Sequence, residues 1–156
     1  VDEADDGTLH VVDYKTGRTD PYKGLSPADP HQGGRHLQLA VYAEAARQRY
    51  GRPDTPVVAS YWFTSAKGRF AELGYPVTPE VAAEVGAAMR TIVEGIETGL
   101  FPPHPLPKET SPFTDCIWCD PDELGTTEAV ARWTHKQADP RLSAYLALVT
   151  PPEAAP

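Results

Sequence analysis

The segment VVDYKTGR, residues 11–18, decides the expected fold of this chain. It is typical of a strand whose side chains alternate between two faces, so Asp13 and Lys15 share one face. Side chains two residues apart on one strand lie about 6.5 to 7 Å apart. At that spacing a carboxylate can hold a hard metal ion while the lysine reaches the substrate that the ion binds.

The same pair also has an ordinary interpretation, because exposed strands often carry solvated ion pairs. Its position favours a functional one. Asp13 ends an apolar run, and the turn Thr16-Gly17-Arg18 follows Lys15 immediately. Apolar strands rarely end in charge on their inward face without a reason.

Length and composition indicate one globular domain of 156 residues with a net charge of -8, and the helices and strands expected below make it an α/β domain. No run approaches the eighteen or more apolar residues of a membrane span. The acidic start at Val1-Asp2-Glu3 is unlike a signal peptide, so we expect a cytoplasmic location and no membrane partner.

The net charge argues against bulk attraction to nucleic acid, but its distribution weakens that objection. Between residues 15 and 36 the cations outnumber the acids. Any phosphate contact is therefore expected from Arg18, Lys23 and Arg35 in this segment. A mixed solvated surface explains the same charges equally well.

The chain is expected to open with a hairpin that turns at Asp5-Asp6-Gly7, with the glycine in the left-handed position. This register pairs Asp2 with His10 on the face opposite Asp13. The position facing Asp13 then falls two residues before Val1.

The following segments predict an alternation of helices and strands. Residues 16–34 are expected to be a long loop. Residues 35–50 are expected to form a helix with Leu37, Val41, Ala45 and Gln48 on one side and with Gln38 and Tyr42 stacked at i and i+4. Residues 56–64 read as a central strand covered on both faces, with 70–75 as its antiparallel partner.

The C-terminal part begins with a helix that starts at Pro79 after a Thr78 cap and ends at Gly99. Its apolar stripe is expected to be core. A proline-rich stretch then runs extended to the cysteines, and two short helices follow at 127–135 and 140–148. We expect a core domain over residues 1–120 and a helical extension with a tail over 121–156.

Three motifs stand in a fixed order: DYKTG at residues 13–17, Gln38-x-x-x-Tyr42, and Cys116-x-x-Cys119 after the prolines. Together they resemble the RecB-like and AddB-like nuclease domains of the PD-(D/E)XK superfamily over residues 1 to about 120. The resemblance implies a restriction-endonuclease-like fold, in which helices flank a mixed central β-sheet. It also implies metal-dependent DNA hydrolysis, with exonuclease character, in a repair or recombination protein, and it makes a helicase domain or subunit a candidate partner.

The resemblance also implies roles for individual residues. Asp13 and the backbone carbonyl of Tyr14 would ligate Mg²⁺ or Mn²⁺, Lys15 would position or activate the attacking water, and Gln38 and Tyr42 would line the site. The family's second acidic ligand lies on the preceding strand, which the register places before Val1. We therefore expect an N-terminally truncated domain whose own metal site is incomplete.

The two cysteines depart from the pattern of relatives that bind a [4Fe-4S] cluster through four cysteines. Cys116 and Cys119 cannot hold that cluster alone, so no complete iron-sulfur site is expected. Zinc bound with His104 and His135, or two reduced thiols, are the alternatives.

Two other function classes remain open. One is a nuclease-fold module without a working metal site that binds DNA or protein partners. The other is a zinc-stabilised interaction domain.

Overall fold

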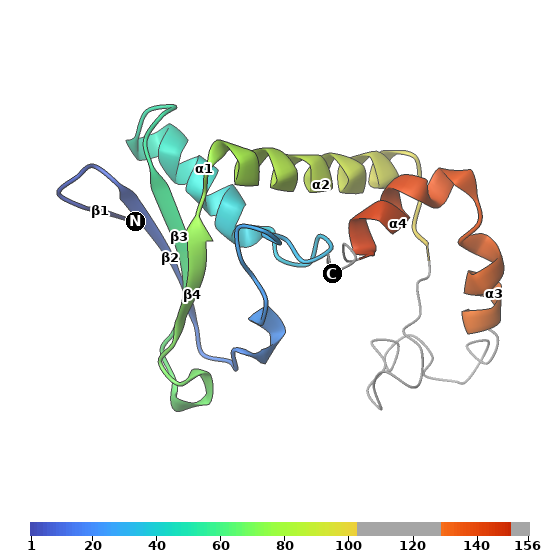
Figure 1. Cartoon of the computed structure of the whole chain (residues 1–156), viewed down its shortest axis with the longest axis horizontal. Helices are drawn as coiled ribbons and strands as arrows, with labels where there is room; N and C mark the ends of the chain where they lie inside the picture. The colour runs from blue at the N-terminus through green and yellow to red at the C-terminus, as the bar shows by residue number, and fades with distance from the viewer. Residues whose placement is uncertain (103–128, 151–156) are drawn as a thin grey trace, which may run out of the picture. The chain divides into compact units, whose positions relative to one another are not determined.

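The computed structural model describes residues 1–102 and 129–150 (Figure 1). The elements follow in the order β1 (Asp2–Glu3), β2 (Leu9–Lys15), α1 (Gln38–Tyr50), β3 (Val57–Phe63), β4 (Glu72–Pro76), α2 (Pro79–Glu97), α3 (Ala129–Lys136) and α4 (Ser143–Val149), with single 3-10 turns at Asp20–Tyr22, Ala66–Gly68 and Pro140–Leu142. The chain divides into two units, Val1–Ile92 with Leu148–Pro156, and Val93–Ala147.

The four strands form one mixed sheet in the order β1-β2-β3-β4 (Figure 1). The β2–β3 pair is parallel and the two outer pairs are antiparallel. The predicted hairpin register is confirmed, because Asp2 pairs with His10 and Gly7 has a φ of +82°. The mixed sheet with flanking helices confirms the predicted fold class.

The parallel β2–β3 pair requires a crossover connection, and α1 forms it. This helix packs against β2 and β3. The side chains that α1 buries are Leu39, Ala40, Ala43 and Ala46. The side of the helix that carries Leu37, Val41, Ala45 and Gln48 is not the buried one, since Val41 is exposed. Three alanines let the helix backbone lie close to the sheet, and no run of large apolar residues reveals that face in the sequence.

One face of the sheet forms the core together with α1 and the first half of α2. Its strand residues are fully buried and come from the alternate positions of β2, β3 and β4: Leu9, Val11, Val57, Ala59, Tyr61, Phe63 and Tyr75. Tyr75 donates a hydrogen bond of 2.8 Å to the carbonyl of Pro30, which ties the long loop to the sheet.

The opposite face of the sheet is only partly covered. Trp62 is 45% exposed and packs on the exposed ring of Tyr14 at 5.7 Å. Ser60 is buried and donates to Glu72 at 2.6 Å. The prediction that β3 is covered on both faces was therefore wrong for its C-terminal end. The period-two pattern places Trp62 on this face but carries no information about what covers it.

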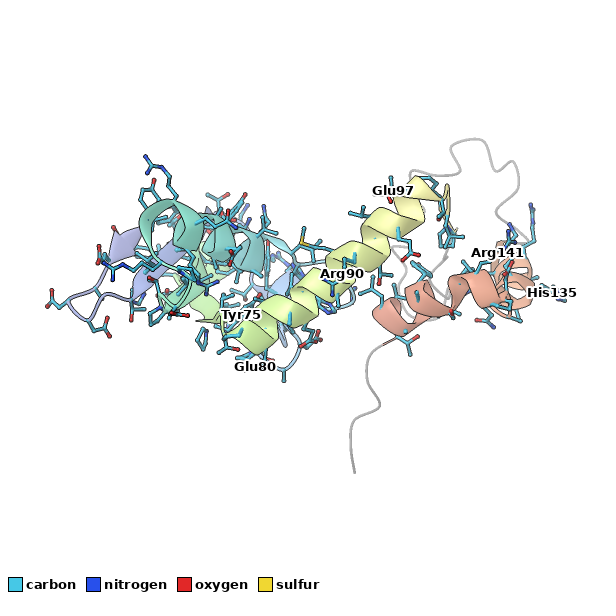
Figure 2. All side chains as sticks on the ribbon, turned by 90° about the horizontal axis from the view of Figure 1, so that it is seen from above. Tyr75, Glu80, Arg90, Glu97, His135 and Arg141 are labelled. Atoms are coloured by element: carbon cyan, nitrogen blue, oxygen red, sulfur yellow. The ribbon has the colours of Figure 1, made fainter. Side chains whose placement is uncertain are left out.

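Helix α2 begins and ends where its sequence signals predict. The Thr78 hydroxyl accepts from the Val81 amide at 3.3 Å, and Leu100 donates to the carbonyl of Gly95 at 2.7 Å after Gly99 takes a φ of +70°. Figure 2 shows charged residues along its length, among them Glu80, Arg90 and Glu97.

The apolar stripe of α2 is buried only in its N-terminal half. Its buried members are Val81, Val85 and Ala88, whereas Met89 is 38% exposed. The expectation that the whole stripe is core was wrong, because this helix is nineteen residues long and, of its buried residues, only Val81 and Val85 near its start belong to the core cluster.

The second unit contains α3 and most of α4. Trp133 and Leu142 are buried, and Trp133 meets Tyr145 edge to face with ring centroids 6.3 Å apart. The proline-rich stretch, His104 and both cysteines lie outside the described residues. Within residues 1–102 and 129–150, no helix is long and apolar enough to cross a membrane.

Candidate functional site

Strand β2 places Asp13 and Lys15 side by side on the face that α1 covers. The Lys15 Nζ lies 2.9 Å from Asp13 Oδ2, and the two side chains are 22% and 19% exposed. Both groups are therefore shielded from most of the solvent yet still accessible from it. A half-shielded ion pair is less screened than a surface pair.

Gln38, the first residue of α1, completes the contact from the neighbouring element. Its side-chain oxygen accepts a hydrogen bond of 3.1 Å from the Lys15 ammonium. The start of α1 is held there by the long loop, since the His36 amide donates to the carbonyl of His31 at 3.0 Å and the His36 ring bonds the carbonyl of Pro21 at 3.0 Å.

Tyr61 of β3 forms the floor of this site and was missed in the sequence. It lies opposite Asp13 in the parallel register, and the Lys15 ammonium sits 4.8 Å from its ring centroid. Cations at this distance are attracted to the negative face of an aromatic ring. Period-two alternation places Tyr61 on the inward face of its strand, but only the pairing of β2 with β3 shows which residue it meets.

An aromatic cluster surrounds Tyr61 and keeps it neutral. Its ring is 1% exposed and lies 4.6 Å from Tyr22, which also contacts Phe63 at 5.5 Å. Burial raises the pKa of Tyr61 well above its usual range, and the nearby phenol of Tyr22 and the carboxylate of Asp13 raise it further. A neutral phenol can donate a hydrogen bond but carries no charge that would compete with Asp13.

Tyr42 lies near this group without joining it. It is partly exposed on α1, and its phenol is close enough to contribute to the raised pKa of Tyr61. The structure thus brings Asp13, Lys15 and Gln38 into direct contact, and Tyr42 into their neighbourhood.

The three basic residues expected to meet phosphate lie in the loop after β2. Arg18 and Arg35 are exposed, and Arg35 donates to the carbonyl of Gln32 at 3.0 Å. Lys23 is paired with Asp20 at 2.6 Å. The Lys23 hydrogen bond and charge, with smaller contributions from Arg18 and Arg69, lower the pKa of Asp20 below its usual value. Arg69 is a cation of this surface that the sequence did not single out.

The donor chemistry of the site suits a hard cation in part. Mg²⁺ binds through one or two carboxylates, water and substrate phosphates. Asp13 supplies one carboxylate, whose Oδ2 is engaged by Lys15. No group of three or more His, Cys, Asp or Glu side chains that could hold a metal occurs within the described part of the chain. Asp2 belongs to the other face, because it pairs with His10. The ligand role of the Tyr14 carbonyl stays a prediction.

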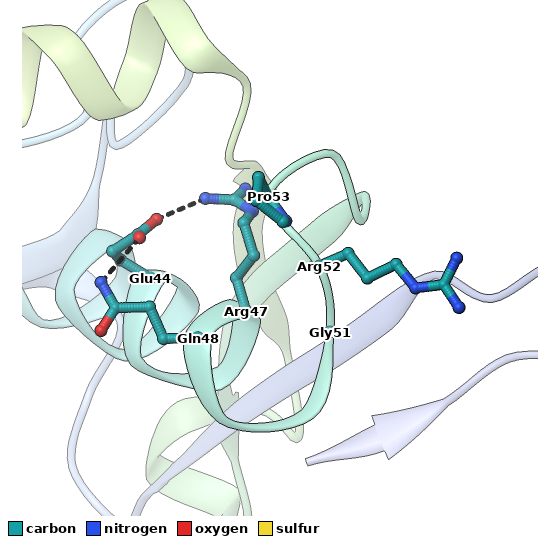
Figure 3. A pocket seen from close by; sticks show the side chains of 6 residues that line it. All are labelled: Glu44, Arg47, Gln48, Gly51, Arg52 and Pro53. Atoms are coloured by element: carbon teal, nitrogen blue, oxygen red, sulfur yellow. Dashed lines mark hydrogen bonds and ion pairs between the residues drawn. The ribbon is translucent and has the colours of Figure 1, made fainter.

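A pocket of about 360 Å³ lies at the other end of α1 (Figure 3) and has a structural role. Arg47 lines it, and each of its three guanidinium nitrogens donates a hydrogen bond within the protein. Its guanidinium donates to Glu44 at 2.6 Å, to the carbonyl of Thr55 at 3.1 Å and to the carbonyl of Val77 at 2.9 Å. These bonds join the end of α1 to the segments before β3 and after β4, which explains the pocket without a ligand.

Comparison with known proteins agrees with this geometry. The sequence model of the PD-(D/E)XK nuclease superfamily matches residues 1–123, which include the whole sheet, α1 and α2. No curated protein and no solved structure matches the chain. The family model covers most of the length of the chain, and an aspartate and a lysine lie two residues apart on an inner strand of its mixed sheet. The chain belongs to the PD-(D/E)XK nuclease superfamily.

Proposed function

We propose that this chain is the nuclease domain of a RecB-like DNA repair or recombination protein and hydrolyses DNA with Mg²⁺ or Mn²⁺, as an exonuclease. The observation that carries the proposal is the Lys15 ammonium, held by Asp13, Gln38 and the ring of Tyr61 at the end of β2. The order of the DYKTG, Gln38-x-x-x-Tyr42 and C-x-x-C motifs supports the RecB-like assignment and attachment to a helicase.

Each residue of this group has a task in phosphodiester hydrolysis. When bound, the divalent ion polarises the phosphate and lowers the pKa of water. Asp13 would hold it through the carboxylate oxygen that Lys15 does not engage. Lys15 is a fixed cation beside the same carboxylate, suited to stabilise negative charge that develops on the phosphate oxygens. Gln38 accepts a hydrogen bond from one of the three ammonium N–H groups and so orients the remaining two.

We further propose that Asp13 needs a second acid to complete the metal site, because one carboxylate leaves most of the octahedral shell to other ligands. Asp2 cannot supply it, since the β1–β2 register pairs Asp2 with His10 on the other face of the sheet. Arg18, Lys23 and Arg35 would contact phosphates along the loop.

The decisive experiment uses the full-length protein with linear DNA and Mg²⁺ or Mn²⁺. Lys15→Ala is expected to lower kcat by roughly 10² to 10³ with little change in DNA affinity, because its contact strengthens only in the transition state. Asp13→Ala should abolish cleavage. Arg49→Gln, an exposed cation at the far end of α1, is the matched control and should cleave normally.

The second candidate is a nuclease-fold module that binds DNA or a protein partner, and the single carboxylate among the described residues near the site favours it. This candidate replaces the nuclease if the protein binds DNA, shows no metal-dependent cleavage and is indifferent to Lys15→Ala. Exonuclease character is tested by substrate form, because a covalently closed circle offers no end. Equal cleavage of circular and linear DNA would contradict it.

In the chain itself, calorimetric titration should show at most weak Mn²⁺ binding, since one carboxylate leaves most of the coordination shell to water. Micromolar affinity that is lost in Asp13→Asn would show that a ligand from within the chain completes the site, and the expectation of an incomplete metal site would be wrong.

A further inference from the structure

The connection between β3 and β4, residues 64–71, lies against the segment through which the chain leaves the proposed active site. The Thr64 amide donates to the carbonyl of Lys15 at 2.9 Å, and the Ser65 hydroxyl donates to the carbonyl of Thr16 at 2.9 Å. These bonds fix the connection to the backbone that carries the site lysine. We call residues 65–71 the β3–β4 tip.

Close packing reinforces this attachment. Gly68 is buried at the base of the tip, where an added Cβ would lie 2.5 Å from the Cβ of Phe63 and 2.9 Å from the carbonyl oxygen of Gly17. Only a residue without a side chain allows the tip to sit this close to the turn after β2. The tip is therefore packed against the turn that follows the strand carrying Asp13 and Lys15.

The tip presents an aromatic ring on an unusual backbone. Arg69 and Phe70 are consecutive non-glycine residues with φ of +57° and +52°. This left-handed conformation is uncommon outside glycine and costs free energy, and such residues concentrate at functional sites. Phe70 is 66% exposed, so its ring contributes little to the core. The tip therefore presents the apolar ring of Phe70 to solvent.

The charge of this surface is positive although the chain as a whole is acidic. The tip carries Lys67 and Arg69, both exposed, and contains no acid. Arg69 of the tip and Arg18 of the loop after β2 are both close enough to Asp20 to lower the pKa of that carboxyl, after the larger effect of Lys23. Three cations, Lys23, Arg18 and Arg69, thus gather around one carboxylate, and the exposed ring of Phe70 directly follows Arg69 in the chain.

The tip is also within reach of a strand bound at Asp13 and Lys15. The carbonyl of Ala71 accepts from the Phe63 amide at 2.8 Å, and Phe63 pairs with Lys15 in the sheet. Ala71 therefore lies two strand spacings from Lys15, about 9.5 Å. A nucleotide next to one bound at the site would meet the tip.

We propose that the β3–β4 tip binds single-stranded DNA, with Phe70 stacking on a base and Lys67, Arg69 and Arg18 contacting the flanking phosphates. The placement of the strand rests on the proposed nuclease site. An exposed aromatic ring among cations suits unpaired nucleotides, whose base faces are free to stack, each stack contributing about 1–3 kcal/mol. A blunt duplex offers no free base face to Phe70 except at its ends.

The test measures binding without cleavage. Fluorescence anisotropy of a labelled twelve-nucleotide oligothymidine is recorded in EDTA with the chain and its variants. Phe70→Ala should weaken binding by about 5- to 150-fold, and Phe70→Trp should restore it. Lys67→Gln and Arg69→Gln should each reduce the slope of log affinity against log salt by about 0.7. Because Phe70, Lys67 and Arg69 are exposed, circular dichroism should show unchanged folding.

The matched controls are Tyr50→Ala and Arg49→Gln, which alter another exposed aromatic ring with an arginine stacked over it at 5.3 Å. Both should leave affinity within about twofold of the unchanged chain. Phe70→Ala should weaken the binding of a blunt duplex of the same length by less than about twofold. No binding of the oligonucleotide, equal losses for single strand and duplex, or equal losses in the controls would overturn the proposal.

This design separates the two proposals. Binding that depends on Phe70 in a protein that never cleaves DNA would refute the nuclease and retain the tip as a binding site. Cleavage that depends on Lys15, with affinity unaffected by Phe70→Ala, would refute the tip alone.

Discussion

The ion pair between Asp13 and Lys15 can be tested in this chain by a double-mutant cycle on the free energy of unfolding. The single changes are Asp13→Asn and Lys15→Met, which keep the size of each side chain while removing its charge. The nitrogen and oxygen lie 2.9 Å apart, and each side chain is about one-fifth exposed. The pair therefore belongs between solvent-exposed pairs and fully buried ones.

The expected coupling follows from that position. Exposed pairs contribute about 0 to 1 kcal/mol, and breaking a fully buried pair costs about 3 to 5 kcal/mol. We expect a coupling of about 1.5 kcal/mol between Asp13 and Lys15. If the free energy of unfolding falls by about 2 kcal/mol per M urea, this coupling corresponds to a shift of about 0.75 M in the urea concentration at the midpoint of unfolding.

Urea denaturation followed by circular dichroism measures all four proteins of the cycle. A parallel cycle on Asp20 and Lys23, which are 2.6 Å apart but largely exposed, provides a control with the same residue types. That cycle should give no resolvable coupling. If the Asp13–Lys15 coupling is equally small, the ammonium is not held on the carboxylate in solution, and the geometry on which the proposed chemistry rests is wrong.

Two further predictions concern the scaffold of the site. Burial raises the pKa of Tyr75 to about 12, so the neutral phenol stabilises the fold below about pH 10, its unfolded pKa, and this stability is lost as pH rises from 10 to 12. Tyr75→Phe should lower the free energy of unfolding by about 1 kcal/mol at pH 7, because it loses the hydrogen bond to Pro30. Urea titrations should show a smaller loss of stability at alkaline pH in this variant, and an equal loss would contradict the assignment. Gly74→Ala should lower the free energy of unfolding by about 3 kcal/mol, since its Cβ would lie 2.2 Å from the carbonyl oxygen of Ala59. Gly17→Ala is the control in thermal melts, because an added Cβ there would meet nothing within 4 Å. Similar losses of stability in the two variants would refute the β3–β4 register.

Local sequence signals were sufficient to predict the main helices and strands and to place Asp13 beside Lys15 in the candidate site. Alternation on β2 was enough to place Asp13 and Lys15 together, because the side-chain period of a strand does not depend on its surroundings. Gly7 was enough to predict the hairpin register, since a left-handed residue at that position determines the loop. The cap of α2 at Thr78 and its end at Gly99 were likewise readable from single residues.

Tertiary structure decided the contacts between elements. That Tyr61 lies under Lys15 depends on β2 pairing in parallel with β3, a choice between strands that no local pattern encodes. The buried side of α1 depended on how closely three alanines allow the helix to approach the sheet. The attachment of the β3–β4 tip to the exit of β2 arises from hydrogen bonds between residues 49 positions apart. Such contacts form only when distant segments meet, so the sequence supplies their chemistry while the packing of the sheet determines their partners.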